Sequence, residues 1–226
     1  MYTNDPIVKP IDAHAHLPLH QISHPICLAA CRPAEWDIIE KKNVFAKGFG
    51  HHPWFVDEAW EPSRLEKILI DNPKSFVGEI GLDRSKKHKH TISKQINVCI
   101  QQLKIAQKLS RPVVFHMVRS SKISYELIRK HYGPKIYFHG YSGSIEEARR
   151  YPQAFFGFHH RMITHPKTKS LIEQIPIHQI LIESDNHSQK EHLWYVIRNL
   201  AQIKNCSISD IVQITRENTL RWLHAK

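Results

Sequence analysis

The chain has 226 residues, of which 41% are hydrophobic and 23% charged, a composition typical of a globular protein with one large core. No apolar run approaches the roughly 18–20 residues of a membrane-spanning helix, and no secretory signal is visible, so we expect no membrane partner. Lysine and arginine number 32 against 21 acidic residues, and the net charge of +11 fits either a polyanionic partner such as nucleic acid or a generally basic surface.

Short apolar runs, often rich in β-branched residues, alternate along the chain with longer segments of helical periodicity. Eight runs are predicted as strands: 11–14, 25–29, 44–48, 75–78, 112–116, 135–139, 154–158 and 179–183. The predicted helices are 33–41, 63–71, 92–109, 124–131, 144–150, 166–174, 189–204 and 209–224. Strands that alternate with helices predict an all-parallel sheet, here a (β/α)8 barrel of the TIM type that forms a single domain over residues 1–226.

Two helix starts carry specific capping signals. Ser144, followed by Ile-Glu-Glu, predicts a capping box, in which the serine and the third residue after it bond each other's backbone N–H groups. Ser209 is predicted to cap the last helix.

Residues that can ligate metals stand at or just past the C-terminal ends of five predicted strands. Barrel active sites lie at this end. The residues are His14 and His16 after the first strand, Glu79 after the fourth, His116 and His139 closing the fifth and sixth, and Asp185 after the eighth. Residues two apart on a strand face the same side, so His14 and His16 should point together. A buried carboxylate could instead be structural, and a strand-end histidine could cap a carbonyl, but so many ligand types at one end favour a bound metal.

Several motifs resemble those of the TatD family of metal-dependent deoxyribonucleases, which belongs to the amidohydrolase-like superfamily of barrels. Residues 11–16 (Ile-Asp-Ala-His-Ala-His) look like its opening motif, and residues 78–83 match its Gly-Glu-Ile-Gly-Leu-Asp signature. Residues 50–53, 139–143, 182–185 and 218–221 are similar to its Gly-x-His-Pro, His-x-x-Ser-Gly, Glu-Thr-Asp and Asn-x-x-Arg motifs. The motifs occur in order and span almost the whole chain.

The resemblance implies a hydrolase that cleaves phosphodiester bonds in DNA with two divalent metal ions, Mg, Mn or Zn. One ion would be held by His14, His16, Glu79 and Asp185. The other would be held by Glu79, His116 and His139, with Glu79 as the bridge. Glu79 and Asp185 would be the catalytic residues. Glu79 would bridge the two ions, and Asp185 could orient or deprotonate the attacking water.

Four further residues are predicted to bind substrate. His52 matches a family position and is assigned to a substrate phosphate or to support of a metal ligand. Arg119 stands one residue later than the arginine of the family's His-x-Arg motif and is expected to clamp a phosphate. Lys87 and Lys89 lie in a basic loop that either meets DNA phosphates or is a solvated charge run.

Other interpretations stay open at this point. The Asp-x-His sequence formed by Asp185 and His187 also resembles the closing motif of PHP-type phosphoesterases. A non-nucleic substrate, such as a small phosphoester or an amide, and a non-catalytic barrel that binds nucleic acid are the remaining alternatives. The four cysteines form no Cys-x-x-Cys motif, so we expect reduced thiols and a cytoplasmic protein. We also expect a monomer.

Overall fold

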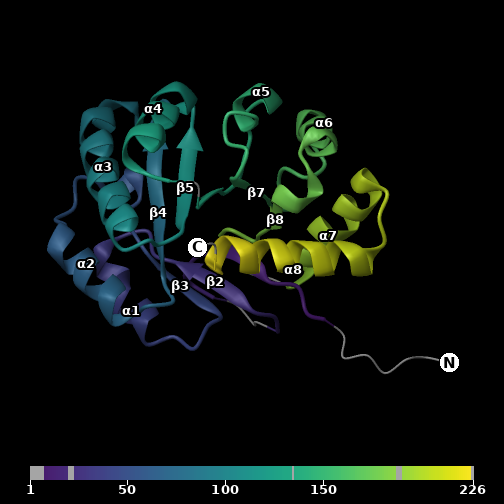
Figure 1. The fold of residues 1–226 in the computed structure, drawn as a ribbon, viewed down its shortest axis with the longest axis horizontal. Helices are drawn as coiled ribbons and strands as arrows, with labels where there is room; N and C mark the ends of the chain where they lie inside the picture. Colours follow the sequence, from purple (N-terminus) through teal and green to yellow (C-terminus); the bar gives the residue numbers. More distant parts are fainter. Residues whose placement is uncertain (1–7, 20–22, 134, 187–189, 225–226) are drawn as a thin grey trace.

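The computed structural model describes residues 8–19, 23–133, 135–186 and 190–224, and it confirms the predicted barrel. All eight strands are parallel, and each pairs with the next one in chain order (Figure 1). The strands are β1 (Asp12–Ala15), β2 (Ile26–Ala29), β3 (Ala46–Phe49), β4 (Phe76–Asp83), β5 (Val113–Val118), β6 (Ile136–Phe138), β7 (Phe155–Phe158) and β8 (Ile180–Ile182). The sheet closes between β8 and β1, where the Asp185 N–H donates to the His14 carbonyl at 3.0 Å.

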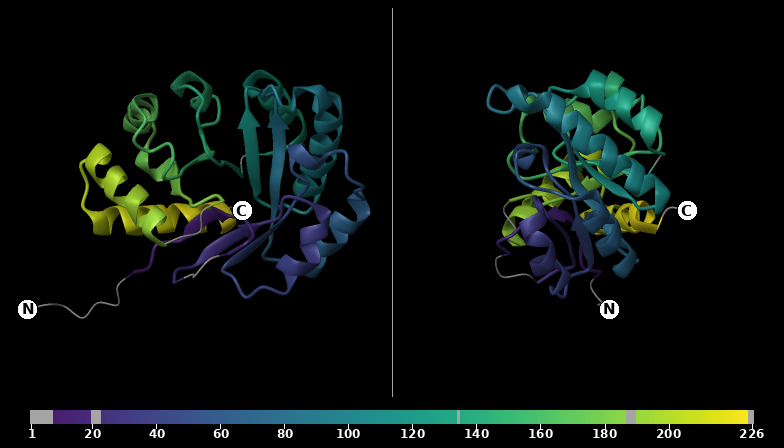
Figure 2. Two further views of the ribbon diagram at one scale, coloured as in Figure 1. Left: turned by 180° about the vertical axis from the view of Figure 1, so that it is seen from behind. Right: turned by 90° about the vertical axis from the view of Figure 1, so that its left-hand side faces the viewer.

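Helices surround the barrel, with α1 to α4 on one side and α6 to α8 on the other (Figures 1 and 2). They are α1 (Trp36–Glu40), α2 (Pro62–Asp71), α3 (Ile92–Lys108), α4 (Ser121–His131), α5 (Ile145–Ala148), α6 (Pro166–Gln174), α7 (Lys190–Lys204) and α8 (Ile208–His224). The described part of the β1–β2 connection contains no helix. No helix among the described residues is long and apolar enough to cross a membrane.

Several helix starts differ from the prediction by one to three residues. Helix α1 begins at Trp36 rather than at residue 33, because residues 33–35 form a 3-10 helix. Helix α4 begins at Ser121 rather than at residue 124. The last helix begins at Ile208, because the hydroxyl of Ser207, not Ser209, accepts the N–H of Asp210 at 3.0 Å. The predicted capping box at Ser144 is confirmed, since its hydroxyl accepts from the Glu147 N–H and the Glu147 carboxylate accepts from the Ser144 N–H.

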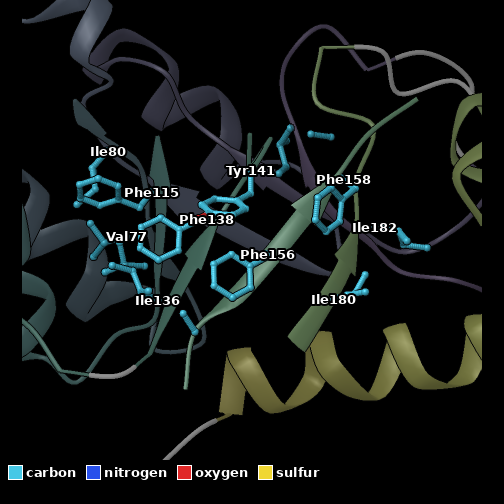
Figure 3. Packing of buried hydrophobic residues seen from close by; sticks show 14 of the residues in the cluster. Val77, Ile80, Phe115, Ile136, Phe138, Tyr141, Phe156, Phe158, Ile180 and Ile182 are labelled. Atoms are coloured by element: carbon cyan, nitrogen blue, oxygen red, sulfur yellow. The ribbon is translucent and has the colours of Figure 1, made fainter. Parts of the chain in front are cut away.

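Apolar side chains form two layers, one on each side of the strands. The outer layer lies between strands and helices, where Phe115, Phe138 and Phe156 of neighbouring strands contact one another (Figure 3). The inner layer fills the barrel and includes Trp222 from the end of α8. The centroid of its ring lies 5.2 Å from that of Phe76 and 5.1 Å from that of Tyr137. Helix α8 therefore inserts a side chain into the barrel and helps to fill its interior.

Strand β4 is longer than predicted, and Glu79 lies inside it rather than just past its end. The pairing register of β4 with β5 shifts by one residue between Val77 and Ile80, so both of these side chains face the outer apolar layer. Such a bulge changes the side to which the residues within it point. A Cβ on the neighbouring Gly50 would come within 2.6 Å of the Gly78 backbone, so glycine allows β3 and β4 to approach here. The bulge thus directs Glu79 into the barrel.

Candidate metal centre

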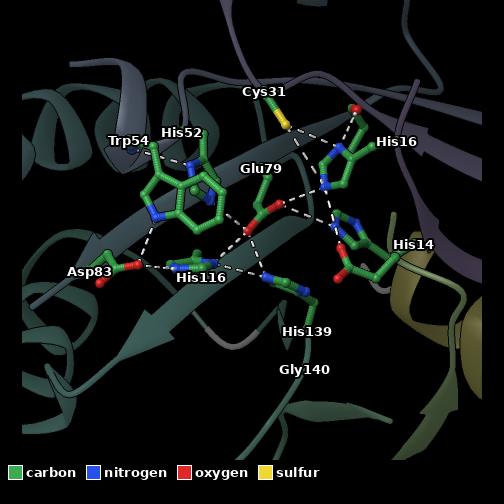
Figure 4. A network of polar contacts seen from close by, with 12 residues as sticks. His14, His16, Cys31, His52, Trp54, Glu79, Asp83, His116, His139 and Gly140 are labelled. Atoms are coloured by element: carbon green, nitrogen blue, oxygen red, sulfur yellow. Dashed lines mark hydrogen bonds and ion pairs between the residues drawn. The ribbon is translucent and has the colours of Figure 1, made fainter. Parts of the chain in front are cut away.

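The carboxylate of Glu79 lies at the centre of five imidazole rings inside the C-terminal end of the barrel (Figure 4). Glu79 is only 1% exposed, and four of the five histidines are buried. The rings belong to His14, His16, His52, His116 and His139.

The two oxygens of Glu79 face different histidines. Oε2 lies 3.2 Å from His14 Nε2 and 2.8 Å from His16 Nε2. Oε1 lies 2.8 Å from His116 Nδ1 and 2.6 Å from His139 Nε2. The carboxylate therefore divides the histidines into two sets, one at each oxygen.

Asp185 completes the cluster from the end of β8. Its Oδ1 lies 3.8 Å from His16 Nε2, and its backbone has a left-handed φ of 56°. This conformation is uncommon for a residue other than glycine, but aspartate adopts it more readily than most. Two backbone hydrogen bonds to β1 hold Asp185 in place, one to His14 O and one from His16 N.

Neighbouring groups fix which ring nitrogen faces Glu79. His16 Nδ1 donates to the Ala29 carbonyl at 2.9 Å, which leaves Nε2 toward the carboxylate. His116 Nε2 lies 3.2 Å from Asp83 Oδ2, which leaves Nδ1 toward Glu79. Metal-binding histidines are oriented in this way by a carbonyl or carboxylate on the far nitrogen. Asp83 also caps a turn, because its Oδ1 accepts from Ser85 N at 2.7 Å.

His52 differs from its neighbours in the nitrogen that is available. The Trp54 N–H donates to His52 Nδ1 at 3.2 Å, so in the neutral ring the proton must lie on Nε2. Nε2 then donates to Glu79 Oε1, 3.1 Å away, and has no lone pair for a metal. His52 is thus arranged as a hydrogen-bond donor. Trp54 itself donates from its indole to Asp83 at 2.6 Å and stacks on His88, so it anchors this loop.

The electrostatics of the cluster favour ionised carboxylates. Burial alone raises the pKa of Glu79, but the positive charge of His139 and of the other rings outweighs it and holds the pKa well below its usual range. The pKa of Asp185 is lowered in the same way against the effect of burial. Burial lowers the pKa of His14 to about 3 and that of His52 to about 4. The pKa of His139 rises to about 9, because Glu79 outweighs burial.

This donor set fits divalent cations. His14, His16 and Glu79 offer ligand atoms within 4.8 Å of one another, and so do His14, His139 and Asp185. Imidazole and carboxylate together suit Zn and Mn and accept Mg through the carboxylates. His14 Nδ1 and His139 Nδ1 have no hydrogen-bond partner among the described residues, although His139 Nδ1 lies 4.0 Å from Glu183 Oε1.

The predicted substrate-binding residues other than His52 lie outside this cluster. Lys87 and Lys89 are exposed on the segment after β4. Arg119 follows β5 with a left-handed φ of 52°, is exposed, and lines a separate hollow. His187, which belongs to the second motif resemblance, lies outside the described residues.

Two further residues at the centre were not predicted from the sequence. Glu183 is fully buried, and it accepts hydrogen bonds from the N–H of Gly140 at 2.7 Å and from the hydroxyl of Tyr137. Tyr137 is two residues before His139 and Gly140 directly follows it, so Glu183 holds the chain on both sides of this histidine. It reaches them past β7 because Gly157 has no side chain, and an added Cβ there would collide with the Glu183 carboxylate and the Tyr137 hydroxyl.

Cys31 is the second unpredicted residue, with Sγ 3.3 Å from His16 Nδ1. The four cysteines are free thiols, as expected. Both residues could have been predicted from the sequence. Glu183 is two residues before Asp185, and Cys31 is two residues past the end of β2, where the search for ligands at strand ends applies equally.

Comparison with known proteins gives consistent matches. A model of the TatD related DNase family matches residues 30–224. The chain is 27% identical over 212 residues to the human 3'-5' RNA nuclease TATDN2, in an alignment that covers 82% of this chain and 28% of that protein. It is 25% identical over 170 residues to human deoxyribonuclease TATDN3, covering 68% of this chain and 62% of that protein. The chain thus spans less than two thirds of the length of either relative.

A solved structure shows the same fold. The crystal structure of YjjV, a TatD homologue from Escherichia coli K12, matches with a TM-score of 0.83 and 23% identity. The match covers 96% of this chain and 98% of that one.

Proposed function

Since the chain belongs to the TatD related DNase family, we propose that it is a divalent-metal-dependent hydrolase that cleaves phosphodiester bonds in DNA. The observation that carries the proposal is Glu79, a buried carboxylate whose two oxygens face two different sets of imidazoles. A carboxylate placed in this way can bridge two cations, each of which takes one oxygen.

We assign His14, His16, Glu79 and Asp185 to one cation and Glu79, His116 and His139 to the other. When bound, two divalent cations stabilise the attacking and leaving oxygens of an in-line displacement and lower the pKa of water. Mg, Mn and Zn are all candidates. The other requirements of the reaction fall to the side chains of this protein.

Asp185 is the proposed proton acceptor. Its lowered pKa keeps it ionised at neutral pH, and its Oδ1 lies 3.8 Å from His16 Nε2. It can therefore orient the attacking water and take up its proton. The bonds that hold its backbone against β1 keep the carboxylate directed at the centre.

His52 is the proposed donor to a substrate phosphate. Its low pKa keeps the ring neutral, and the Trp54 N–H places its remaining proton on Nε2. In the structure this proton is directed at Glu79 Oε1, 3.1 Å away. If a cation took that oxygen, the N–H would be free to donate to a phosphate oxygen without competing with the cations for ligands. Deep burial of the cluster strengthens each of these interactions.

The test uses purified protein that is stripped of metal and then supplied with Mg, Mn or Zn. End-labelled single-stranded DNA is the substrate, and Asp185→Asn is the control for contaminating nucleases. We expect metal-dependent degradation that is lost in Asp185→Asn while the fold survives. A product ladder that shortens from one end would show exonuclease action. No degradation with any metal, despite bound ions, would reject DNA hydrolysis in favour of a small phosphoester or amide substrate.

RNA is a second candidate substrate, because the relative TATDN2 is named a 3'-5' RNA nuclease. A labelled RNA of the same sequence, run beside the DNA with the same control, separates the two. Faster metal-dependent cleavage of the RNA would transfer the proposal to RNA.

A further inference from the structure

A second feature at the same end of the barrel is a hollow of about 500 Å³ on the β5 and β6 side. Its walls come from the segments that follow β4, β5, β6 and β7, so it opens on the face that carries the metal centre. Met117, in its wall, directly follows His116 in β5, and Ser142 lies three residues after His139. The hollow therefore adjoins the centre on the side of these two histidines.

The lining is strongly basic. Four of its residues carry a positive charge and one carries a negative charge: Arg84, Arg119, Lys122 and Lys167 against Glu147. Arg84, Arg119 and Lys122 form no ion pair with any residue that the structure describes, and all four cations are exposed. Lys167 Nζ donates to the Ser142 carbonyl at 3.4 Å, a bond that does not neutralise its charge. Exposed like charges around one hollow repel one another, and an anion between them would relieve that repulsion.

Glu147 is the one opposing charge, and its oxygens are already engaged. Oε2 accepts from the Ser144 N–H at 3.1 Å as part of the capping box, and Oε1 accepts from the Ser121 hydroxyl. These bonds disperse part of its charge at one wall. The start of α4 is in the same wall, and its first turn has no acidic residue and no side-chain cap from Ser120. The partial positive charge of this 11-residue helix therefore adds to that of the cations.

We propose that this hollow binds a backbone phosphate of a nucleic acid strand whose scissile phosphate is at the metal centre. The inference rests on the proposed function, because it is the neighbouring centre that identifies the anion as part of a strand. It gives Arg119 a role consistent with its position, since it contacts the substrate beyond the reacting phosphate rather than at it. Phosphate contacts of this kind position a strand and carry no sequence information.

The test is equilibrium binding of fluorescent dT12 to metal-free protein in EDTA, across a series of salt concentrations. The variant is Lys122→Ala/Lys167→Ala. The matched control is Lys41→Ala/Lys42→Ala, which removes the same charge from two exposed residues after α1, away from the hollow. Each phosphate contact on single strands contributes about 0.7 to the slope of log affinity against log salt. We expect the slope to fall by about 0.7 to 1.4 in the variant and by less in the control.

A charge-retaining variant distinguishes the effect of lost charge from the effect of lost structure. Lys122→Arg/Lys167→Arg should keep the wild-type slope, and thermal melts of all variants check the fold. Equal slopes in the hollow pair and the control pair would overturn the proposal, even if the protein cleaves DNA. A slope that depends on the hollow in a protein that cleaves no nucleic acid would instead reject the proposed hydrolysis and retain the binding site.

Discussion

The two ends of the barrel interior differ in chemistry although the same strands build both. Toward the N-terminal end the interior is apolar, with Phe76, Val114, Tyr137 and Leu181 around Trp222. Two residues after Val114, Tyr137 and Leu181, the chain carries His116, His139 and Glu183 instead. Along β5, β6 and β8 the alternation continues unchanged from one end to the other, so in these strands the difference lies only in which side chains it presents. The apolar end stabilises the fold, and the polar end holds the proposed metal centre.

The largest expected effect comes from removing the charge at the polar end. Glu79→Gln keeps the shape of the side chain but leaves the imidazoles without their shared carboxylate. We expect loss of bound metal and a fall in DNA hydrolysis of roughly 10³-fold or more, equivalent to about 4 kcal/mol of transition-state stabilisation. Initial rates and elemental analysis of bound metal measure both. Glu126→Gln, on an exposed face of α4, is the matched control and should match the wild type. Full metal content in Glu79→Gln would contradict the bridging role.

At the apolar end the corresponding change is Trp222→Ala. The side chain is fully buried against Phe76 and Tyr137, so its removal should lower the free energy of unfolding by about 3–5 kcal/mol. Urea denaturation measures this. Trp222→Phe should lose less and, once folded, should bind metal as the wild type does. A folded Trp222→Phe protein without metal would show that the two ends are not separable.

Asp83 tests how far the polar end depends on its supporting residues. Asp83→Asn removes the charge that accepts from His116 Nε2 and from the Trp54 indole. We expect metal affinity to fall by about 10–100-fold, which is typical for such partners. Competition with a chelating dye gives the affinity, and Asp37→Asn, at an exposed ion pair, is the control. Unchanged affinity would mean that packing alone orients His116.

The smallest effect concerns pH. His139 has a pKa of about 9 in the metal-free protein, so between pH 7 and 9 it must lose a proton before it can bind a cation. Affinity should therefore rise with pH over this range by up to about tenfold per unit. Calorimetry in two buffers of different ionisation enthalpy would report the released proton. Affinity that falls as pH rises over this range would contradict the assignment.

Much of the barrel could be predicted because apolar runs and helix signals agree along the chain. The six predicted metal ligands do converge, five of them at or near the C-terminal ends of parallel strands and Glu79 from within β4. Glu79 shows where alternation fails. Phe76 and Glu79 are three residues apart and should face opposite sides, yet both lie inside the barrel because of the bulge in β4. A bulge depends on the partner strand, so the local sequence does not reveal it.

The sequence also did not predict the direction in which single side chains point. His52 stands beside His116 and Glu79 like a ligand, and only the Trp54 N–H on its far nitrogen distinguishes it as a donor. Arg119 was expected to clamp a phosphate, and the sequence did not show that its backbone, with a left-handed φ, places it at the hollow rather than at the metal centre. Such details follow from contacts between segments that are distant in the chain.

The central claim is that Glu79 bridges two cations. Anomalous diffraction from crystals grown with Mn would test it most directly, because the positions of the ions are then observed without reference to activity. We predict two peaks about 3.5–4 Å apart, one at each oxygen of Glu79. A single peak, or peaks that do not contact Glu79, would contradict the account.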